Sequence, residues 1–449
     1  MWSFRRRIFV LMIVVGSVGI VQGQTNSEDI RPKGNSPYSR FGLGDFVNQY
    51  YAAAAGMGGL TAGFQDPYNL NTENPASLAS LQSTAFEVGF FAKYADLQGR
   101  NGASDKVWSG NLNYLALGFP LINPISKVLD KRTSPWNYGM SLSLQPYHTV
   151  AYDIRADVNY GEDIEVTTNI FKGNGGTYRF LWGNGIKYKN LAAGISLGYL
   201  FGKMSNSRRI EFDSLDLAYG TEFLDEISVS GFIWNAGLQY TLEFGEKDRN
   251  QFFTKRLTLG VYGNNSSNFD TNTSRLYTRT NFYTATDTLI YEVGAKRKGT
   301  LPSQLTAGIV YEQLNKFKIG AEYSTGKWSE YQNEAKPETL ADASRLAFGL
   351  EYIPEYNSYD SYLRRMRYRA GFIYTKDPRV INNDQIKEYI VTIGAGFPII
   401  MPRQQISFIN LSIEAGQFGI TDAIKENFVR MTLGFTLNDN TWFFKRKFN

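Results

Sequence analysis

The stretch NPASLASLQSTAFEVGFFAKY, residues 74–94, decides the fold, because an Asn-Pro turn leads there into a two-residue rhythm. Apolar side chains recur at every second position: Phe86, Val88, Phe90, Ala92 and Tyr94. The positions between them are Glu87, Gly89, Phe91 and Lys93. Successive side chains of a strand point to opposite faces. The stretch therefore predicts a strand with one apolar face and one face of mixed, small or charged residues.

The same rhythm recurs to the end of the chain, for example in 191–202, 305–312 and 429–437. One parity is aliphatic or aromatic, and the other carries Gly, Ser, Thr and charge. The pattern predicts fourteen strands, at 84–97, 107–121, 136–153, 176–189, 191–204, 230–244, 254–268, 302–313, 316–326, 343–353, 366–376, 387–397, 404–416 and 427–438.

Strand length and linker length favour a membrane barrel over a soluble β-sandwich. The predicted strands run about 10 to 15 residues, which exceeds the usual length in soluble sheets and is enough for a tilted membrane span. Near-minimal turns at Asn190 and Asn315-Lys316 alternate with long links at 154–175, 205–229, 269–301 and 327–342. Short periplasmic turns and long external loops are typical of outer-membrane barrels. We therefore predict an all-β fold, a transmembrane antiparallel β-barrel of about 14 strands.

Composition agrees with this fold class. The chain has 29 Tyr and 31 Phe, and membrane barrels concentrate aromatic residues in girdles at both lipid–water interfaces. Mean hydropathy is −0.32, as alternation of lipid-facing and lumen-facing residues produces. An aromatic-rich secreted β-sandwich or propeller is the alternative.

The start of the chain predicts export. Three arginines at 5–7 precede an apolar run that ends near Val21, and small residues suited to signal peptidase follow. We predict a signal peptide at 1–23; the rival interpretation is a membrane anchor, but the run is shorter than the roughly 20 residues of a spanning helix. The chain has no Cys and a net charge of +5, so lipid acylation and disulfides are excluded and no nucleic-acid partner is indicated.

Residues 24–83 do not alternate. They include SPYSRFGLGDF (36–46) and AAAAGMGG (52–59), which are too apolar for a free linker and too rich in Gly for an independent domain. A barrel of about fourteen strands is too wide for its own side chains to fill. We therefore predict a plug at 24–83 inside a barrel formed by 84–449.

The order of short motifs before the first strand resembles the FadL/OmpP1/TodX family of outer-membrane transport barrels. The motifs are Ala52 to Ala55, Met57-Gly58-Gly59, Asp66, Asn74-Pro75-Ala76, Leu78 and Leu81. SPYSRFGLGD (36–45) and LGFTLNDNTWFFKRKFN (433–449) are similar to the branch found in Bacteroidota. The resemblance implies a plugged fourteen-stranded barrel that passes hydrophobic molecules, such as long-chain fatty acids or aromatic hydrocarbons. It also implies their sideways release at a kinked third strand.

The third predicted strand contains Pro146. Proline lacks an N–H and is excluded from central strands except at bulges. One interpretation is a lateral opening at Gln145, Pro146 and Tyr147; the other is a bulge that only sets curvature.

Four apolar residues, Phe41, Leu43, Phe46 and Met57, are candidates for a plug surface that contacts ligand, although they could equally pack the plug against the wall. Asn74, Pro75 and Ala76 are expected to form the turn from plug to strand through Asx-turn chemistry.

Catalytic and metal chemistry find little support. His148 is the single histidine and no Cys is present, so neither a His cluster for metal nor a Cys-His pair exists, and no cofactor is indicated. Acidic residues crowd two of the long links, where they either hold cations that bridge lipopolysaccharide or are simply solvated; they are Asp153, Asp157, Glu162, Asp163, Glu165, Asp213, Asp216, Glu222, Asp225 and Glu226. A basic run at 445–447 among aromatic residues suits an interface anchor.

These features predict a passive transporter in the outer membrane with no chemical step. Its partners would be membrane lipid or lipopolysaccharide and a hydrophobic small molecule. The alternative is a barrel that acts as a docking subunit of an outer-membrane secretion or barrel-assembly complex. The long links at 205–229 and 269–301 suit either function, and an outer-membrane enzyme is the least supported reading.

Overall fold

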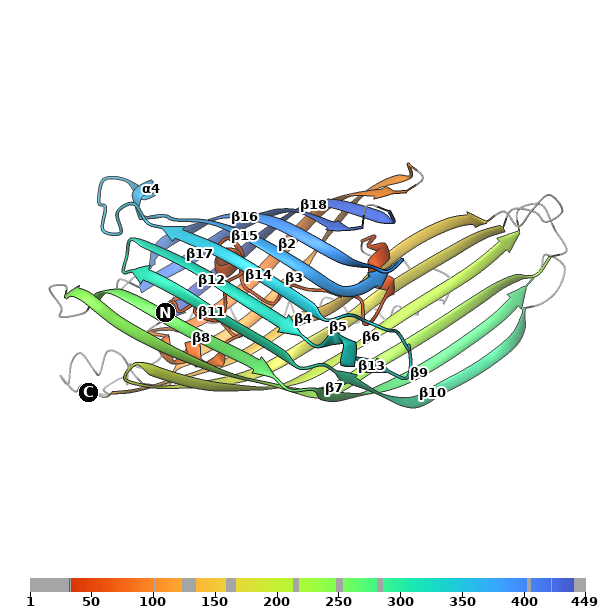
Figure 1. Ribbon diagram of the computed structural model, residues 1–449, viewed down its shortest axis with the longest axis horizontal. Coiled ribbons are helices and arrows are strands. Elements are labelled where there is room, and N and C mark those ends of the chain that lie inside the picture. The colour runs from red at the N-terminus through yellow and green to blue at the C-terminus, as the bar shows by residue number, and fades with distance from the viewer. Residues whose placement is uncertain are drawn as a thin grey trace, which may run out of the picture. The chain divides into compact units, whose positions relative to one another are not determined.

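The computed structural model describes residues 32, 34–100, 102–122, 135–158, 167–212, 218–247, 253–280, 286–401, 405–420 and 422–439 (Figure 1). The predicted signal peptide at 1–23 and the basic run at 445–447 lie outside the described residues.

The wall is one antiparallel sheet that closes on itself, since β18 pairs with β2 and each further strand with its neighbour. Its segments are β2 (Thr84–Gly99), β3 (Ser104–Pro120), β4 (Trp136–Val158), β5 (Thr167–Tyr188), β6 (Leu191–Phe212), β7 (Gly220–Lys247), β8 (Phe253–Asn264), β9 (Ser267–Thr280), β10 (Asp287–Leu301), β11 (Gln304–Gln313), β12 (Phe317–Gly326), β14 (Ala343–Tyr352), β15 (Arg367–Ile381), β16 (Asp384–Met401), β17 (Gln405–Gly419) and β18 (Ile424–Asp439).

Two pairs of consecutive segments each form one wall strand. β8 and β9 both pair with β7 and together form one wall strand. β11 pairs with β8 and β10 pairs with β9, so β10 and β11 form the next wall strand. The described residues therefore form a closed barrel of fourteen strands, and the predicted number and order are confirmed.

On the external side, the observed strands extend further than the sequence predicted. Most of the predicted links 154–175, 205–229 and 269–301 is strand, because β4, β5, β6, β7, β9 and β10 extend into them. Of the acidic residues that the sequence pattern singled out, those within the described residues, Asp153, Asp157, Glu222, Asp225 and Glu226, lie on strands β4 and β7. Above the lipid both faces of a strand meet water, so the apolar parity that marks a strand in sequence disappears there.

The apolar parity faces outward. In β2, Phe86 and Phe90 are 37% and 47% exposed, whereas Glu87 between them is 1% exposed. Large outward apolar side chains recur on the other wall strands, among them Tyr199, Phe232, Ile319 and Val391. Such a continuous apolar exterior is stable only against lipid, which identifies a transmembrane barrel. Among the described residues, no helix is long and apolar enough to cross a membrane.

Residues 34–83, the N-terminal segment, contain η1 (Pro37–Arg40), the short β1 (Asp45–Phe46), α2 (Ala52–Ala55) and η2 (Pro75–Ser80). The remaining short elements are η3 (Trp328–Glu330), β13 (Gln332–Asn333) and α4 (Tyr362–Arg365). η3 and β13 occupy the predicted link 327–342, and Trp328 in it is buried.

Inward-facing glycines let the N-terminal segment lie directly on the wall. A Cβ on Gly394 of β16 would lie 2.7 Å from Gly56 Cα, and one on Gly349 of β14 would meet the Met57 carbonyl. Gly58 has a φ of +64°, which glycine adopts without strain. The small residues on the inward parity therefore make room for main chain, so segment and wall are in van der Waals contact.

Candidate functional site: a charged lumen, a cavity and a lateral seam

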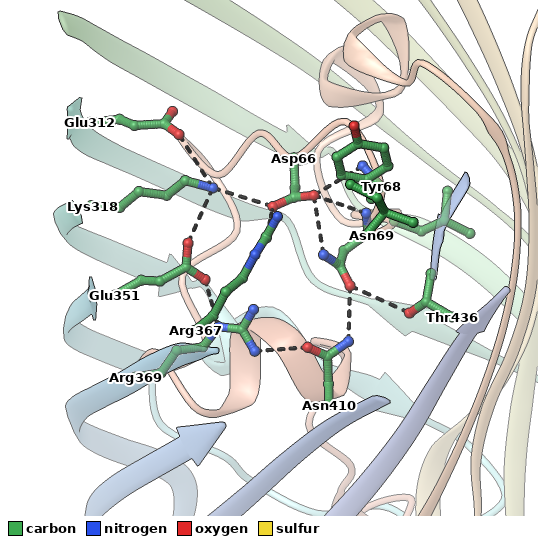
Figure 2. A network of polar contacts seen from close by, with 12 residues as sticks. Asp66, Tyr68, Asn69, Glu312, Lys318, Glu351, Arg367, Arg369, Asn410 and Thr436 are labelled. Carbon is green, nitrogen blue, oxygen red and sulfur yellow. Dashed lines mark hydrogen bonds and ion pairs between the residues drawn. The ribbon is translucent and has the colours of Figure 1, made fainter. Parts of the chain in front are cut away.

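Asp66 of the N-terminal segment lies at the centre of a buried polar network (Figure 2). Its Oδ2 accepts a hydrogen bond from Arg367 Nη1 at 2.5 Å and lies 3.3 Å from Lys318 Nζ. Its Oδ1 accepts from the backbone N–H groups of Tyr68 and Asn69 at 2.9 and 3.1 Å. One carboxylate thus ties the segment to β12 and β15.

The network continues along the wall. Lys318 Nζ lies 3.5 Å from carboxylate oxygens of both Glu312 and Glu351, and Arg369 Nε donates to Glu351 at 2.7 Å. Arg369 Nη1 donates to Asn410 Oδ1 at 2.8 Å (Figure 2). These side chains all face inward from β11, β12, β14, β15 and β17, so the network takes side chains from five segments on one side of the wall.

The charges around Asp66 decide its ionisation. Burial alone raises the pKa of this carboxyl, but the positive charges of Arg367 and Lys318 outweigh burial and hold the pKa far below its usual range. Asp66 is therefore an anion at every physiological pH, and its charge is matched inside the lumen.

Other wall carboxylates bind the main chain of the N-terminal segment. Glu322 Oε2 accepts from the N–H groups of Thr61 and Ala62 at 2.7 and 2.6 Å, and Glu87 Oε1 accepts from Leu70 N–H at 2.6 Å. A buried N–H without a partner is costly, so these carboxylates satisfy an irregular stretch that has no helix or sheet of its own.

β3 and β4 pair over only part of their length. The pairs run from Pro120–Gly139 to Leu115–Leu144, whereas β4 pairs with β5 as far as Val158. Among the described residues, the external parts of β3 and β4 make no ladder with each other. We call this boundary, residues 104–114 of β3 and 145–158 of β4, the seam.

The N-terminal segment covers the β4 side of the seam. β1 pairs antiparallel with β4, and Asp45 lies opposite Thr149. Ser36 N–H donates to the Ala151 carbonyl at 2.7 Å. A Cβ on Gly34 would lie 3.3 Å from that of Ser109 in β3, so the segment lies between the two strands.

Pro146 lies where the seam begins. The register between β4 and β5 shifts between Pro146 and His148. Just beyond the shift, Gly176 and Gly175 oppose Thr149 and Val150 and have φ values of +147° and +114°. The Pro146 carbonyl accepts a hydrogen bond from Gln49 Nε2 at 3.1 Å. The proline thus coincides both with a bulge and with the end of the β3–β4 ladder.

A cavity of about 600 Å³ borders both sides of the seam. From β3 it is lined by Val107, Ser109 and Asn111, and from β4 by residues 146 and 148–151. Phe46, Trp328 and Tyr178 add aromatic walls, whereas Lys93, Glu414 and Arg430 add charge, so the lining is amphipathic. A second cavity of about 240 Å³ is lined by Tyr147, Arg179 and Tyr262, among others.

The four candidate plug residues occupy different environments. Phe46 lines the larger cavity and packs edge-on against His148 and Trp328, each at a ring separation of 4.7 Å. Leu43 and Met57 are 3% and 0% exposed and do not line either described cavity. Phe41 ends η1 and is half-buried, also away from both cavities.

The other candidate residues lie at the turn and at the seam. Asn74 Oδ1 accepts from Ala76 N–H at 3.2 Å, the geometry of an Asx turn, while its Nδ2 donates to the Ala62 carbonyl at 2.7 Å. Pro75 begins η2. The Gln145 amide lies 2.9 Å from Gln49 Oε1.

No motif in the sequence singled out the charged side chains of the wall. In the sequence these charges appear on the inward-facing parity of the strands, as with Glu87, Lys318, Glu322 and Arg369. The same pattern is expected of a water-filled pore, so it does not indicate a buried network. Trp328 was missed because its link was expected to lie outside the barrel.

The described residues hold no group of His, Asp and Glu arranged to bind a metal ion. His148 Nδ1 lies 3.2 Å from Thr177 Oγ1 and its ring is 2% exposed. Thr177 and three aromatic rings surround it, an arrangement typical of a packed lumen residue.

A closed fourteen-stranded barrel with polar lumen and apolar exterior defines a transmembrane β-barrel of the outer-membrane type. The chain belongs to the BamG family, whose sequence profile matches residues 5–449. No curated protein matches the chain.

Solved structures share the fold. The CymD monoaromatic hydrocarbon channel is 14% identical, with 87% of this chain and 97% of that chain covered and a TM-score of 0.53. A Pseudomonas aeruginosa FadL homologue is 13% identical, with 88% and 99% covered and a TM-score of 0.53. The Ralstonia pickettii toluene transporter TbuX is 13% identical, with 87% and 99% covered and a TM-score of 0.52. At this identity the likeness establishes the fold.

Proposed function

We propose that the protein passes hydrophobic small molecules from the cell exterior into the outer membrane, through the larger cavity and the seam. The observation that carries this proposal is that, in the described residues, one cavity borders β3 and β4 where these two strands do not pair with each other. A lateral exit delivers an apolar molecule directly into lipid, so the molecule avoids the free-energy cost of returning to water.

Residues 24–83 act in this proposal as a plug. The ion pairs of Asp66 and the main-chain contacts of Glu322 and Glu87 support a closed periplasmic side. The export of the chain by a signal peptide at 1–23 belongs to the same proposal, as does the role of Gln145, Pro146 and Tyr147 at the exit.

The lining favours an amphiphile over a pure hydrocarbon. Phe46 and Trp328 supply apolar surface, and Arg430 and Lys93 supply positive charge on another wall of the same cavity. A long-chain fatty acid has both an apolar tail and a carboxylate. Both cations have acidic neighbours, since Lys93 pairs with Glu426 and Arg430 lies 3.8 Å from Glu414, so a bound carboxylate would compete with these pairs.

A reversible lock tests the lateral route. A Cβ on Gly34 would lie 3.8 Å from Ala151 Cβ, which matches the Cβ separation of a disulfide. Because the chain has no Cys, Gly34→Cys with Ala151→Cys gives one defined bond. We expect oxidised cells to lose uptake of radiolabelled oleate and a reductant to restore it, while Gly34→Cys alone remains active. Unchanged uptake in the locked protein would refute this route.

Membership of the BamG family favours a second function, that of a subunit in an outer-membrane barrel-assembly complex. Purification from mild detergent separates the two. Stoichiometric recovery with other outer-membrane proteins, together with oleate uptake equal to that of cells lacking the chain, supports the subunit function. A lone barrel that mediates uptake supports transport.

A further inference from the structure

One edge of β10 pairs with a neighbouring strand along its length, whereas the other edge pairs only near the C-terminal end of β10. It pairs with β9 from Asp287 to Leu301. On the other edge, β13 opposes Gly299 and Thr300, and Glu334 N–H donates to the Lys298 carbonyl at 3.0 Å. β12, the neighbour of β11, ends at Gly326. Within the described part of the chain, no strand pairs with this second edge of residues 287–297, which we call the free edge.

The free edge exposes large apolar side chains beyond the wall. Tyr291 is 74% exposed, Val293 65%, Leu289 48% and Ile290 46%. The short turn at Asn315-Lys316 lies at the opposite end of the barrel from these side chains. Short turns mark the periplasmic end of an outer-membrane barrel, so these side chains lie at its external end. An apolar strand edge in water is a template for pairing with another chain.

The edge also carries features that restrict which strand can pair with it. The β9–β10 register shifts between Thr288 and Ile290 and again between Glu292 and Ala295. Lys296 and Lys298 are exposed. Bulges and lysines discourage indiscriminate pairing of edge strands, so a matching partner must follow the twist and supply negative charge.

β13 shows how a strand adds to this edge. It runs antiparallel to β10, and its next residue, Glu334, accepts a hydrogen bond from Lys298 N–H at 2.9 Å through Oε2. After Glu334 the chain turns away, since Lys336 N–H donates to the Asn333 carbonyl. The chain therefore supplies a short added strand with a carboxylate, and the rest of the edge continues the same surface.

We propose that the free edge of β10 binds an extended segment of a second, surface-exposed protein as an added antiparallel strand. The segment would carry apolar side chains at alternate positions and an acidic residue near Lys296. Strand addition obtains affinity from main-chain hydrogen bonds and selectivity from alternate side chains. The proposal is independent of the transport route and of the second function.

A second copy of the chain does not fit this edge. Barrels inserted in the same sense place their β10 strands in the same axial direction, whereas β13 establishes antiparallel pairing. Strands tilt by roughly 35–45° from the membrane normal, so two copies related by an axis along the normal would cross their edges steeply and form no ladder.

Site-directed photo-cross-linking in intact cells tests the proposal. A benzoylphenylalanine replaces Tyr291 at the free edge, and Tyr323 on the lipid-facing side of β12 serves as the matched control. We expect a protein adduct at 291 whose cross-linked peptide, identified by mass spectrometry, is one defined segment of another protein. The control position is expected to give no protein adduct.

A backbone-specific variant distinguishes strand addition from simple apolar contact. Lys298 N–H points to the edge, because it donates to Glu334, and Lys296 N–H points the same way by alternation. Lys296→Pro therefore removes an edge donor and leaves the β9 ladder intact. We expect the adduct to disappear in Lys296→Pro, to weaken in Lys296→Glu and to persist in Lys296→Arg, with the barrel folded in each case by heat-modifiable migration on gels.

Four outcomes would overturn the proposal. They are the absence of a protein adduct at 291, an adduct with a second copy or with the same chain, an adduct with lipopolysaccharide alone, and an adduct of unchanged yield in a folded Lys296→Pro variant.

Discussion

Arg367 Nη1 lies 2.5 Å from Asp66 Oδ2, across a sequence separation of 301 residues. Both side chains are at most 7% exposed. The pair joins an irregular stretch of the N-terminal segment to the beginning of β15, so the stability of the lumen depends on a contact that no local sequence pattern reveals.

Removal of the Asp66 charge should destabilise the folded barrel. Asp66→Asn leaves Arg367 and Lys318 buried without their shared anion, and loss of one partner from a buried ion pair costs about 3–5 kcal/mol. Urea unfolding in lipid vesicles measures the change in free energy. Asp384→Asn, at the exposed first residue of β16, is the control and should change stability by about 0.5 kcal/mol or less. A small effect of Asp66→Asn would show that water or neighbouring carboxylates compensate.

The same carboxylate predicts a dependence on pH. The folded-state pKa of Asp66 is lowered relative to the unfolded value of about 3.9. Its contribution is therefore fully present above that value and declines as the pH falls below about 4. The difference in free energy of unfolding between the native chain and Asp66→Asn should shrink between pH 6 and pH 3. A constant difference would contradict the assignment of the pair.

The close approach of segment and wall predicts a steric effect at Gly394. A Cβ there would lie 2.7 Å from Gly56 Cα, so Gly394→Ala should cost about 1–3 kcal/mol by forcing the main chain apart. Protease sensitivity of residues 34–83 reports the displacement. Gly220→Ala is the control, since the nearest atom to its Cβ, the Ile210 carbonyl oxygen, is 3.4 Å away. Equal sensitivity of both variants would argue against tight packing.

The proposed exit predicts an effect of Pro146. Pro146→Ala supplies the N–H that proline lacks and permits a more regular β4 at the end of the β3–β4 ladder, so oleate uptake should fall. Pro398→Ala changes another proline within a wall strand, far from the seam in the order of strands, and should leave uptake unchanged. If Pro146→Ala transports normally, the bulge sets curvature only.

Sequence periodicity predicted the barrel because the cause of the pattern is local. Each strand alternates between lipid and lumen, so Phe86 and Glu87 differ in environment whichever strands lie beside them. The fourteen strands and their order follow from that alternation. The extensions of β4, β5, β6, β7, β9 and β10 escaped prediction because both of their faces meet water above the membrane.

The functional features required pairing information. The β3–β4 ladder ends at Leu115 and Leu144, although β3 and β4 both continue beyond these residues. Pro146 is the one residue nearby whose type marks that end. The free edge of β10 exists because β12 ends at Gly326, and Asp66 finds Arg367 only when the segment lies inside the wall. What the amino-acid order determined was therefore which face of each strand meets lipid, since that depends on neighbours one and two positions away. The tertiary structure decided where strands lack partners and which charges meet, because both depend on residues far apart in the chain.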